Sequence, residues 1–157
     1  MVATGRRQAA VTVVVKPDAD RLRPVELDVT DAAQARTAVD AAISRFGGND
    51  VLVNNAAFGQ MGFFEELTIK AAHEQFAKNL FSAFCVTWAV LPRMRSARKD
   101  WIFNILSRGG IFGAQLGSLY CSSKFALEGF SECLSKEVSP FGIWSRWSSL
   151  VRSVPSS

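Results

Sequence analysis

Tyr120 and Lys124 are the residues whose types and spacing are best suited to chemistry. They lie four positions apart at the start of a predicted helix, so both side chains project from one face, about one turn apart. An ammonium group beside a phenol favours the phenolate. Such a tyrosine can donate its proton to a carbonyl oxygen or accept one from an alcohol. By itself the spacing is a weak signal, because either residue is often an ordinary surface side chain.

Ser107 and Asn79 are two further polar candidates. Ser107 follows an apolar run that is typical of a strand, and its hydroxyl could hold the same substrate oxygen. Asn79 lies inside a long predicted helix, where asparagine is a poor helix former, so a polar residue there needs a reason. The alternatives are a turn-forming role for Ser107 and a solvated helix position for Asn79. The combination is the stronger signal, because its members fall at the ends of predicted elements.

The elements that must position these residues alternate between short apolar strands and helices. This order predicts an α/β fold, a doubly wound parallel sheet of Rossmann-like type with helices on both faces. Ligands bind such sheets beyond the carboxyl ends of the strands. Residues 8–22 are hard to assign, although Val11–Val15 has strand propensity. The predicted strands are 2–4, 23–29, 50–54 (a buried strand) and 101–106, and the predicted helices are 31–46, 69–94 and 118–138.

Length and composition bound the class of protein. The chain has 157 residues, of which 48% are hydrophobic, so we expect one globular domain. The net charge of +4 favours anionic ligands such as nucleotide phosphates. No basic stretch is interleaved with stacking aromatics, so no nucleic acid partner is expected. No apolar run is long enough to cross a bilayer, so no membrane role is expected either.

The cysteines and the histidine indicate the compartment and exclude some sites. Cys85, Cys121 and Cys133 are odd in number and form no Cys-x-x-Cys pair, which predicts a reducing, cytoplasmic location. His73 is the single histidine. The chain therefore has too few histidine and paired cysteine residues for a histidine-based catalytic triad or a metal cluster, and no metal is expected.

Taken in order, the motifs of the chain resemble those of the short-chain dehydrogenase/reductase family. Ser107 lies in FNILSRGG, 13 residues before Tyr120, as the family expects. The resemblance covers about residues 1–143, which we expect to form a partial dinucleotide-binding domain, with 144–157 as an irregular tail. The other matching motifs are LDVT at 27–30, NNAA at 54–57, Asn79 and YCSSK at 120–124.

The resemblance implies an activity and a role for each residue. The family moves hydride between NAD(P) and an alcohol or carbonyl. Tyr120 would be the general acid and base, and Lys124 would support it and bind the nicotinamide ribose. Ser107 would orient the substrate oxygen, and Asn79 would support a water relay to Lys124. The resemblance also implies a homodimer formed through the long helix and the tyrosine-bearing helix.

The end of the first predicted strand indicates which dinucleotide is bound. An acidic residue there binds the ribose 2′-hydroxyl, whereas a nearby arginine accommodates a 2′-phosphate. Gly5 occupies that position and Arg6 and Arg7 follow, so we predict NADP, with NAD as the alternative and Arg6 as the contact. Two solvated surface arginines are the competing interpretation. The predicted cofactor-binding residues are Arg6, Asp28, Val29, Asn54, Ala56, Tyr120 and Lys124.

The chain departs from the family pattern at both ends. Gly5 is the only glycine before Gly47, so the family's Gly-rich phosphate turn has no counterpart. Strand 2–4 then corresponds to the family's second strand. After residue 143 the sequence lacks the family's apolar strand and substrate loop. We therefore expect an incomplete Rossmann-like fold in which the first and last strands are missing.

Two functional interpretations follow. The first is an NADP-dependent oxidoreductase that acts on a small-molecule carbonyl compound or secondary alcohol, supported by the intact set of four polar residues. The alternative is a truncated, catalytically impaired remnant that acts at most as a structural or dimerising fold, supported by the missing phosphate turn. The aromatic loop after residue 54 favours an apolar substrate, through Phe58, Met61, Phe63 and Phe64.

Overall fold

The computed structural model describes residues 1–15 and 20–149. Its strands are β1 (Val2–Gly5), β2 (Arg23–Glu26), β3 (Val51–Asn54), β4 (Trp101–Leu106) and β5 (Trp144–Ser149). Its α-helices are α1 (Gln8–Val15), α2 (Ala32–Phe46), α3 (Ile69–Phe76), α4 (Ser82–Ala97) and α5 (Ser118–Val138). A π-helical turn, Ala77–Phe81, joins α3 to α4, and short 3-10 turns occupy Phe64–Glu66, Arg108–Gly110 and Ser139–Phe141. No helix in the described ranges is long and apolar enough to cross a membrane.

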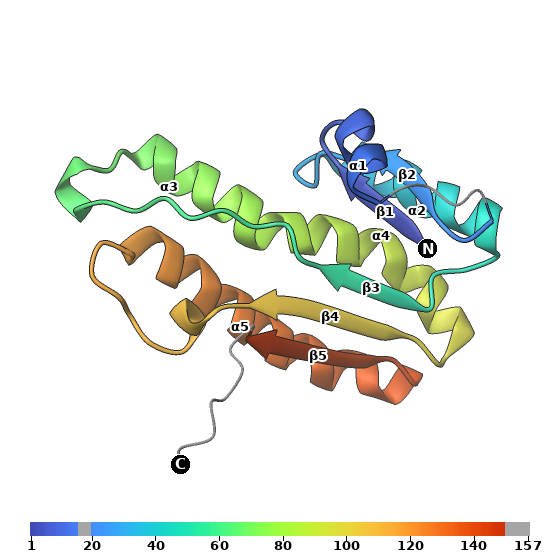
Figure 1. The fold of residues 1–157 in the computed structure, drawn as a ribbon. Coiled ribbons are helices and arrows are strands. Elements are labelled where there is room, and N and C mark those ends of the chain that lie inside the picture. Colours follow the sequence, from blue (N-terminus) through green and yellow to red (C-terminus); the bar gives the residue numbers. More distant parts are fainter. Residues whose placement is uncertain (16–19, 150–157) are drawn as a thin grey trace, which may run out of the picture.

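The strands form two separate parallel sheets (Figure 1). In the first, β1 pairs with β2, and in the second the order is β3-β4-β5. The prediction of an α/β fold with parallel strands and flanking helices is confirmed. β1 and β3 are not hydrogen-bonded to each other, which agrees with the predicted incomplete Rossmann-like fold, in which the first strand is missing. The two sheets leave a gap where a continuous sheet would have another strand.

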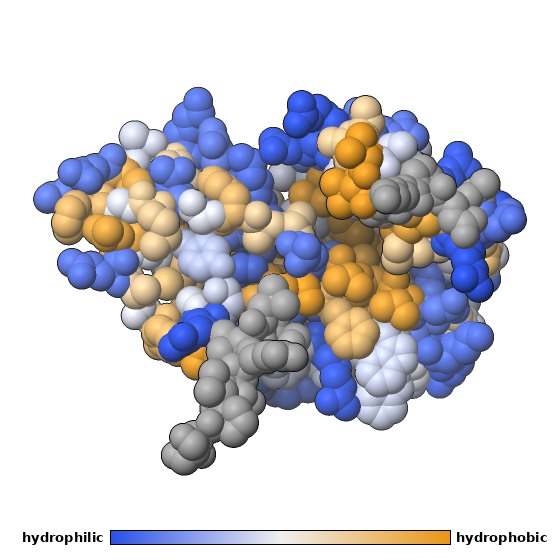
Figure 2. Space-filling view, in the orientation of Figure 1, coloured by the Kyte–Doolittle hydropathy of each residue, from blue (hydrophilic) through white to orange (hydrophobic). Residues whose placement is uncertain are grey.

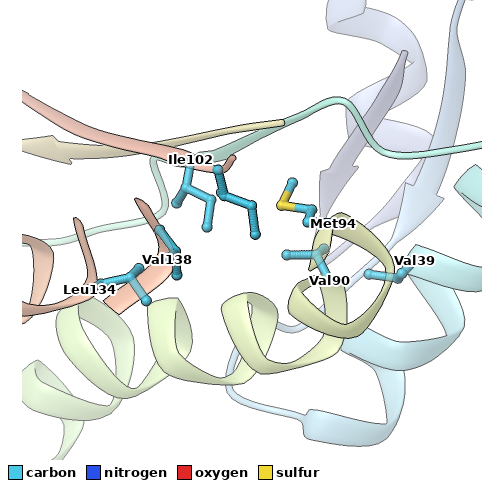
Figure 3. Close-up of a cluster of buried hydrophobic side chains, with 7 residues drawn as sticks. Val39, Val90, Met94, Ile102, Leu134 and Val138 are labelled. Carbon is cyan, nitrogen blue, oxygen red and sulfur yellow. The ribbon is translucent and has the colours of Figure 1, made fainter. Parts of the chain in front are cut away.

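The main hydrophobic core lies between the second sheet and helices α2, α4 and α5 (Figure 3). Met94 of α4 and Ile102 of β4 are both 0% exposed at its centre. The helices begin and end where local signals place them. Asp31 caps α2 by accepting hydrogen bonds from Ala33 and Gln34, and Gly47 ends it in a left-handed conformation at φ 79°.

The opposite face of the second sheet is open. Along β4, Ile102, Asn104 and Leu106 are buried against the helices, whereas the alternate residues are only half-buried. Val51 and Val53 of β3 are each 54% exposed, which corrects the prediction of a buried strand. Leu52, between them, packs on the helix-covered core, so Val51 and Val53 project from the open face. Figure 2 shows hydrophobic residues gathered over this face and around the hollow between the sheets.

Residues 144–149 form strand β5, so the prediction of an irregular tail from residue 144 is wrong for this part. The free edge of β4 supplies the hydrogen-bonding partners, and Trp144 is paired in register with Trp101. The N–H of Trp144 donates to the carbonyl of Asp100 over 2.9 Å, which starts the pairing. The remainder of the predicted tail, residues 150–157, lies outside the described residues.

Three element boundaries also differ from expectation. The segment with strand propensity, Val11–Val15, is helical and belongs to α1, because α1 packs on β1 and β2 and tertiary packing outweighs a weak local preference. Strand β2 ends at Glu26 rather than at residue 29. The predicted helix 69–94 is interrupted by the π-helical turn at Ala77–Phe81 and continues to Ala97.

Asp100 has an unusual position between α4 and β4. Its side chain is 1% exposed, and neither carboxylate oxygen has a hydrogen-bond partner. Burial, with the nearby charge of Asp50 as a smaller contribution, raises the pKa of this carboxyl above its ordinary value of 3.8. The ionised carboxylate therefore destabilises the folded chain at neutral pH.

We expect Asp100→Asn to increase the free energy of unfolding at pH 7 by about 1 kcal/mol, because it removes an unpaired buried charge. The gain should shrink as the pH falls towards 3.8, since the carboxyl is then protonated in the folded chain and its charge no longer opposes folding. Urea unfolding at pH 4 and pH 7 measures both effects. Asp40→Asn, a matched change on the exposed face of α2, serves as the control. A gain that is equal at the two pH values would contradict this account.

Candidate active site

The ring of Tyr120 is held between two loops that follow neighbouring strands. Tyr120 lies in the first turn of α5. A Cβ added at Gly109, in the turn after β4, would lie 3.0 Å from its ring carbon Cε1. A Cβ added at Gly59, in the loop after β3, would lie 3.5 Å from Cδ2. Glycine at position 109 therefore lets the turn after β4 approach the ring closely, whereas an added Cβ at Gly59 would make only ordinary van der Waals contact.

Lys124 lies one turn further along α5 and is buried, with 3% of its surface exposed. Its ammonium Nζ donates a hydrogen bond of 2.9 Å to the carbonyl oxygen of Ile105 near the end of β4. Burial lowers the pKa of this amine. An ammonium has three N–H donors, so the Ile105 bond leaves two for a ligand or for Tyr120.

Ser107 follows β4 directly. Its Oγ accepts a hydrogen bond of 3.3 Å from the N–H of Gly109 and so starts the short turn Arg108–Gly110. Because the oxygen accepts this bond, the hydroxyl hydrogen stays available to donate. Ser107 therefore does form a turn, as the alternative interpretation expected. This does not exclude the proposed role in holding the substrate oxygen, because that role uses the hydroxyl hydrogen.

Asn79 is 1% exposed and lies in the π-helical turn between α3 and α4. Its Oδ1 accepts from the N–H of Phe58 over 2.9 Å, and its Nδ2 donates to the carbonyl of Phe58 over 2.9 Å and to Ser123 Oγ over 3.0 Å. A solvated helix position is therefore wrong for Asn79. The side chain fastens the loop after β3 to the residue that precedes Lys124. The water relay stays a prediction.

Gln75 performs a similar task one turn earlier, and sequence reasoning missed it. Its Oε1 accepts from the N–H of Gln60 and its Nε2 donates to the carbonyl of Phe58, both over 2.7 Å. The signal that could have revealed it is the pair of amide side chains at Gln75 and Asn79, four residues apart on one helix. Ser123, which receives a bond from Asn79, was missed in the same way.

Asn54 ends β3 and belongs to a buried polar chain. Its Nδ2 donates to Asn104 Oδ1 over 2.9 Å and to Thr87 Oγ1 over 3.3 Å. Asn104 in turn donates to Ser131 Oγ over 2.8 Å. Both amide hydrogens of Asn54 are thus used within the fold, and its side chain positions the end of the strand. Contact between Asn54 and a cofactor stays a prediction.

Asp28 and Arg6 follow β2 and β1. Asp28 Oδ1 accepts from the hydroxyl of Thr30 over 2.7 Å and from its N–H over 2.9 Å. These bonds, and to a smaller degree the charges of Arg6 and Lys78, hold the pKa of the Asp28 carboxyl below its ordinary value. Asp28 is therefore an ionised acceptor, and the Arg6 side chain next to it is exposed.

Two cavities are lined by the predicted cofactor-binding residues except Lys124, which lines neither. The larger, about 880 Å³, lies between the two sheets and is lined at its carboxyl end by Arg6, Asp28, Val29, Asn54 and Ala56. The smaller, about 670 Å³, has Tyr120 in its wall. Ala57 and Phe58 line both cavities, so the two adjoin. Of the predicted substrate-loop residues, Phe58 and Met61 line the smaller cavity, whereas Phe63 and Phe64 are exposed outside it.

The residues present fit the two ends of a dinucleotide. An ionised acceptor and an exposed guanidinium stand at one end of the larger cavity, and the buried ammonium of Lys124 and the phenol of Tyr120 stand at the opposite side of the loop after β3. A glycine-rich turn for the pyrophosphate is absent from the described residues. The fit is therefore to the nucleoside ends and not to the phosphates.

Known proteins share both the sequence and the fold. The family model described as short chain dehydrogenase matches residues 1–145. A 3-ketodihydrosphingosine reductase from Bacteroides thetaiotaomicron is 43% identical over 123 residues, which are 78% of this chain and 46% of that protein. Oxidoreductase BOA17 from Botryotinia fuckeliana is 38% identical over 144 residues, which are 91% of this chain and 53% of that protein.

The structural similarity extends over nearly the whole chain. The crystal structure of a short-chain dehydrogenase from Streptomyces avermitilis superposes with a TM-score of 0.89 at 36% identity, covering 98% of this chain and 57% of that one. ElxO with NADP bound has a TM-score of 0.87 at 24% identity, which shows a common fold. The chain spans about half the length of the curated relatives it matches. Motifs, fold and both comparisons agree, and the chain belongs to the short-chain dehydrogenase family.

Proposed function

We propose that this chain carries the catalytic centre of an oxidoreductase that transfers hydride between NADP(H) and a carbonyl compound or secondary alcohol. The observation that carries the proposal is the placement of Tyr120. Its ring lies between Gly59 and Gly109, and the buried Lys124 follows one turn later on the same helix. A tyrosine with only a structural role at the surface would need neither the two flanking loops nor the buried ammonium of Lys124. The same geometry does not favour a catalytically impaired remnant.

In reduction, the hydroxyl of Tyr120 donates its proton to the carbonyl oxygen of the substrate, and in oxidation it accepts the proton of the alcohol. Lys124, buried one turn further along α5, supplies a positive charge on the same helix face. The Ser107 hydroxyl, whose hydrogen is available to donate, holds the substrate oxygen. The nicotinamide supplies or accepts the hydride when it is bound. Asn79 positions the loop after β3 and, through Ser123, the turn that carries Lys124.

The test of the proposal is a direct assay of the purified chain. NADPH oxidation is followed by the loss of the absorbance of the reduced nicotinamide, with a panel of apolar ketones and aldehydes as substrates. Titration calorimetry with NADPH and NADH measures binding separately from turnover. Turnover of any ketone that depends on NADPH supports the proposal. A folded chain that binds neither dinucleotide would contradict it.

The choice of NADP rests on Arg6. We expect Arg6→Ala to weaken NADPH binding about 10-fold and to leave NADH binding nearly unchanged, because only NADPH has a 2′-phosphate for the guanidinium. Calorimetric titration of both dinucleotides measures the two affinities. Arg7→Ala, the same change at the adjacent exposed position, is the matched control. Equal losses for NADPH and NADH in Arg6→Ala would indicate a general effect of charge instead.

The smaller cavity favours an apolar substrate. Beside Tyr120 its walls include Phe58, Met61, Phe112 and Ala114. The Bacteroides relative is named a 3-ketodihydrosphingosine reductase, and a Mycobacterium tuberculosis relative, 38% identical over 125 residues, is named a 3-alpha-(or 20-beta)-hydroxysteroid dehydrogenase. We therefore place long-chain and polycyclic ketones first in the panel.

We further propose a homodimer formed through α4 and α5, in a reducing, cytoplasmic compartment. Trp88 is 68% exposed on α4 and packs edge-on against Phe84 at a centroid distance of 5.8 Å. Phe81 of the adjoining turn and Phe125 of α5 are also exposed. Cys85, Cys121 and Cys133 are all free thiols, which suits a reducing compartment.

We expect Trp88→Glu to convert the dimer to a monomer, because it places a charge in the centre of an apolar contact. Light scattering coupled to gel filtration measures the mass. Ser96→Glu, at an exposed neutral position on the same helix outside the aromatic group, is the control for a general effect of added charge. A wild-type chain that is monomeric at all concentrations would refute the dimer without affecting the proposed chemistry.

A further inference from the structure

Gln75 is a wholly buried amide near the end of α3, with 0% of its surface exposed. It lines neither of the two cavities. Burying an amide costs free energy unless its polar atoms are hydrogen-bonded, and an apolar side chain would fill the same space without that cost. The groups to which Gln75 is bonded therefore indicate its role.

The two partners of Gln75 lie on either side of Gly59. Its Oε1 accepts from the N–H of Gln60, and its Nε2 donates to the carbonyl of Phe58, each over 2.7 Å. These are the two backbone groups that one residue of a neighbouring parallel strand would bond. The side chain thus holds segment 58–60 in place as a strand would. Figure 1 shows this loop running alongside α3.

The other contacts of this loop leave its middle unsupported. Asn79 bonds both backbone groups of Phe58, which begins the segment. At the other end, the N–H of Gly62 donates over 2.9 Å to a carbonyl in the loop before α5. Within the described part of the chain, the bond from Gln60 to Gln75 is the only hydrogen bond made by residues 59–61. Gln75 therefore decides where this stretch of backbone lies.

The same stretch of backbone forms a wall of the smaller cavity. Phe58 and Gly59 line this cavity together with Tyr120. A Cβ added at Gly59 would lie 3.5 Å from Cδ2 of the Tyr120 ring. The backbone that Gln75 holds is thus the backbone that meets the ring. A shift of segment 58–60 would change the space between the cavity wall and Tyr120.

We propose that Gln75 is a positioning residue of the active site. By bonding Phe58 and Gln60 it holds Gly59 beside the Tyr120 ring and fixes the width of the cavity in which the carbonyl compound binds. Its effect on substrates rests on the proposed hydride transfer, whereas its effect on the loop does not. A fixed wall favours a compact ketone, because a small ring then keeps its contacts next to Tyr120.

Gln75→Met tests the support of the loop, because it removes both hydrogen bonds and keeps a side chain of similar length. Glu74→Met inserts the same side chain at the adjacent exposed position and is the matched control. We expect amide hydrogen exchange at Gln60 to become at least ~10-fold faster in Gln75→Met. Exchange at Phe58 should stay slow, since its N–H is still bonded to Asn79.

The ring of Tyr120 reports whether the loop acts on the active site. Tyr120 is the only tyrosine of the chain, so tyrosine with a ¹³C-labelled ring gives NMR signals from this residue alone. We expect these signals to shift in Gln75→Met and to stay unchanged in Glu74→Met.

Steady-state kinetics with cyclohexanone and a bicyclic decalone measures the effect on substrate choice. We expect the kcat/KM for decalone divided by that for cyclohexanone to rise at least ~10-fold in Gln75→Met. The change should come from a higher KM for cyclohexanone, which loses its contact with the wall. If Gln75 only stabilised the fold, both ketones would lose kcat/KM by the same factor.

Unchanged exchange at Gln60, or an unchanged Tyr120 signal, in folded Gln75→Met would overturn the proposal. So would an equal loss of kcat/KM for the two ketones. A wild-type chain that reduces neither ketone would overturn the proposed function instead, and the exchange and ring signals, which need no substrate, would still decide whether Gln75 positions the loop. If Gln75→Met gives too little folded protein, Gln75→Asn provides the same comparison, because its amide is one methylene too short to reach both backbone groups.

Discussion

Tyr120→Phe is expected to lower kcat/KM for ketone reduction by about 10²–10⁴-fold, the usual contribution of a positioned acid or base. The substitution removes one oxygen and keeps the ring. The ring makes the contacts with Gly59 and Gly109, so the loops on either side should stay in place. NADPH binding and the melting temperature should therefore change little.

The measurement is a comparison of steady-state kinetics, NADPH calorimetry and thermal melting in the wild type and the variant. Ser118→Ala, which removes a hydroxyl two residues away on the same helix, is the matched control and should keep most of the activity. If Tyr120→Phe retained more than about a tenth of the wild-type kcat/KM, Tyr120 would not be the proton donor. Another group next to the smaller cavity would then have to supply the proton.

Ile102→Ala is expected to have the largest effect on stability, a loss of about 2–5 kcal/mol in the free energy of unfolding. Ile102 is 0% exposed and packs among residues from α2, α4 and α5, so truncation leaves a cavity that several elements would have to move to fill. Since domains of this size have about 5–15 kcal/mol of stability, the loss is a large share of the total.

Ile105→Ala is the matched control, because it makes the same truncation on the same strand. Ile105 lies on the open face of β4 and is only half-buried, so we expect a loss of about 1 kcal/mol. Urea unfolding followed by tryptophan fluorescence measures both variants. If Ile102→Ala leaves too little folded protein, Ile102→Val gives a smaller step of about 0.5–1.5 kcal/mol. Equal losses at the two positions would mean that the open face is covered in solution.

The parts of this protein that depend on neighbours in the chain were predictable. Asp31 caps α2 and Gly47 ends it because capping needs only the adjacent backbone. Tyr120 and Lys124 share a helix face for the same kind of reason, since four residues make about one turn. The parallel strands followed from their alternation with helices. A sequence pattern is sufficient wherever the controlling interactions lie within one element or one turn.

Features that depend on distant contacts could not be read in this way. Asn79 is oriented by Phe58 and Ser123, which lie 21 and 44 residues away in the chain. Strand β5 exists because the edge of β4 offers partners to a segment with little pattern of its own.

Residue types and spacing predicted which side chains belong to the candidate site, and the exposure of Val51 and Val53 shows where that kind of prediction stops. Their apolar side chains predict burial, but they project from the open face of the second sheet and both are half exposed. Burial is decided by what packs against a strand, and hydrophobicity only states a preference. The residues of the candidate site could therefore be proposed from the sequence, whereas the hydrogen-bond partners of Asn79 and the pairing of β5 with β4 were decided by tertiary contacts.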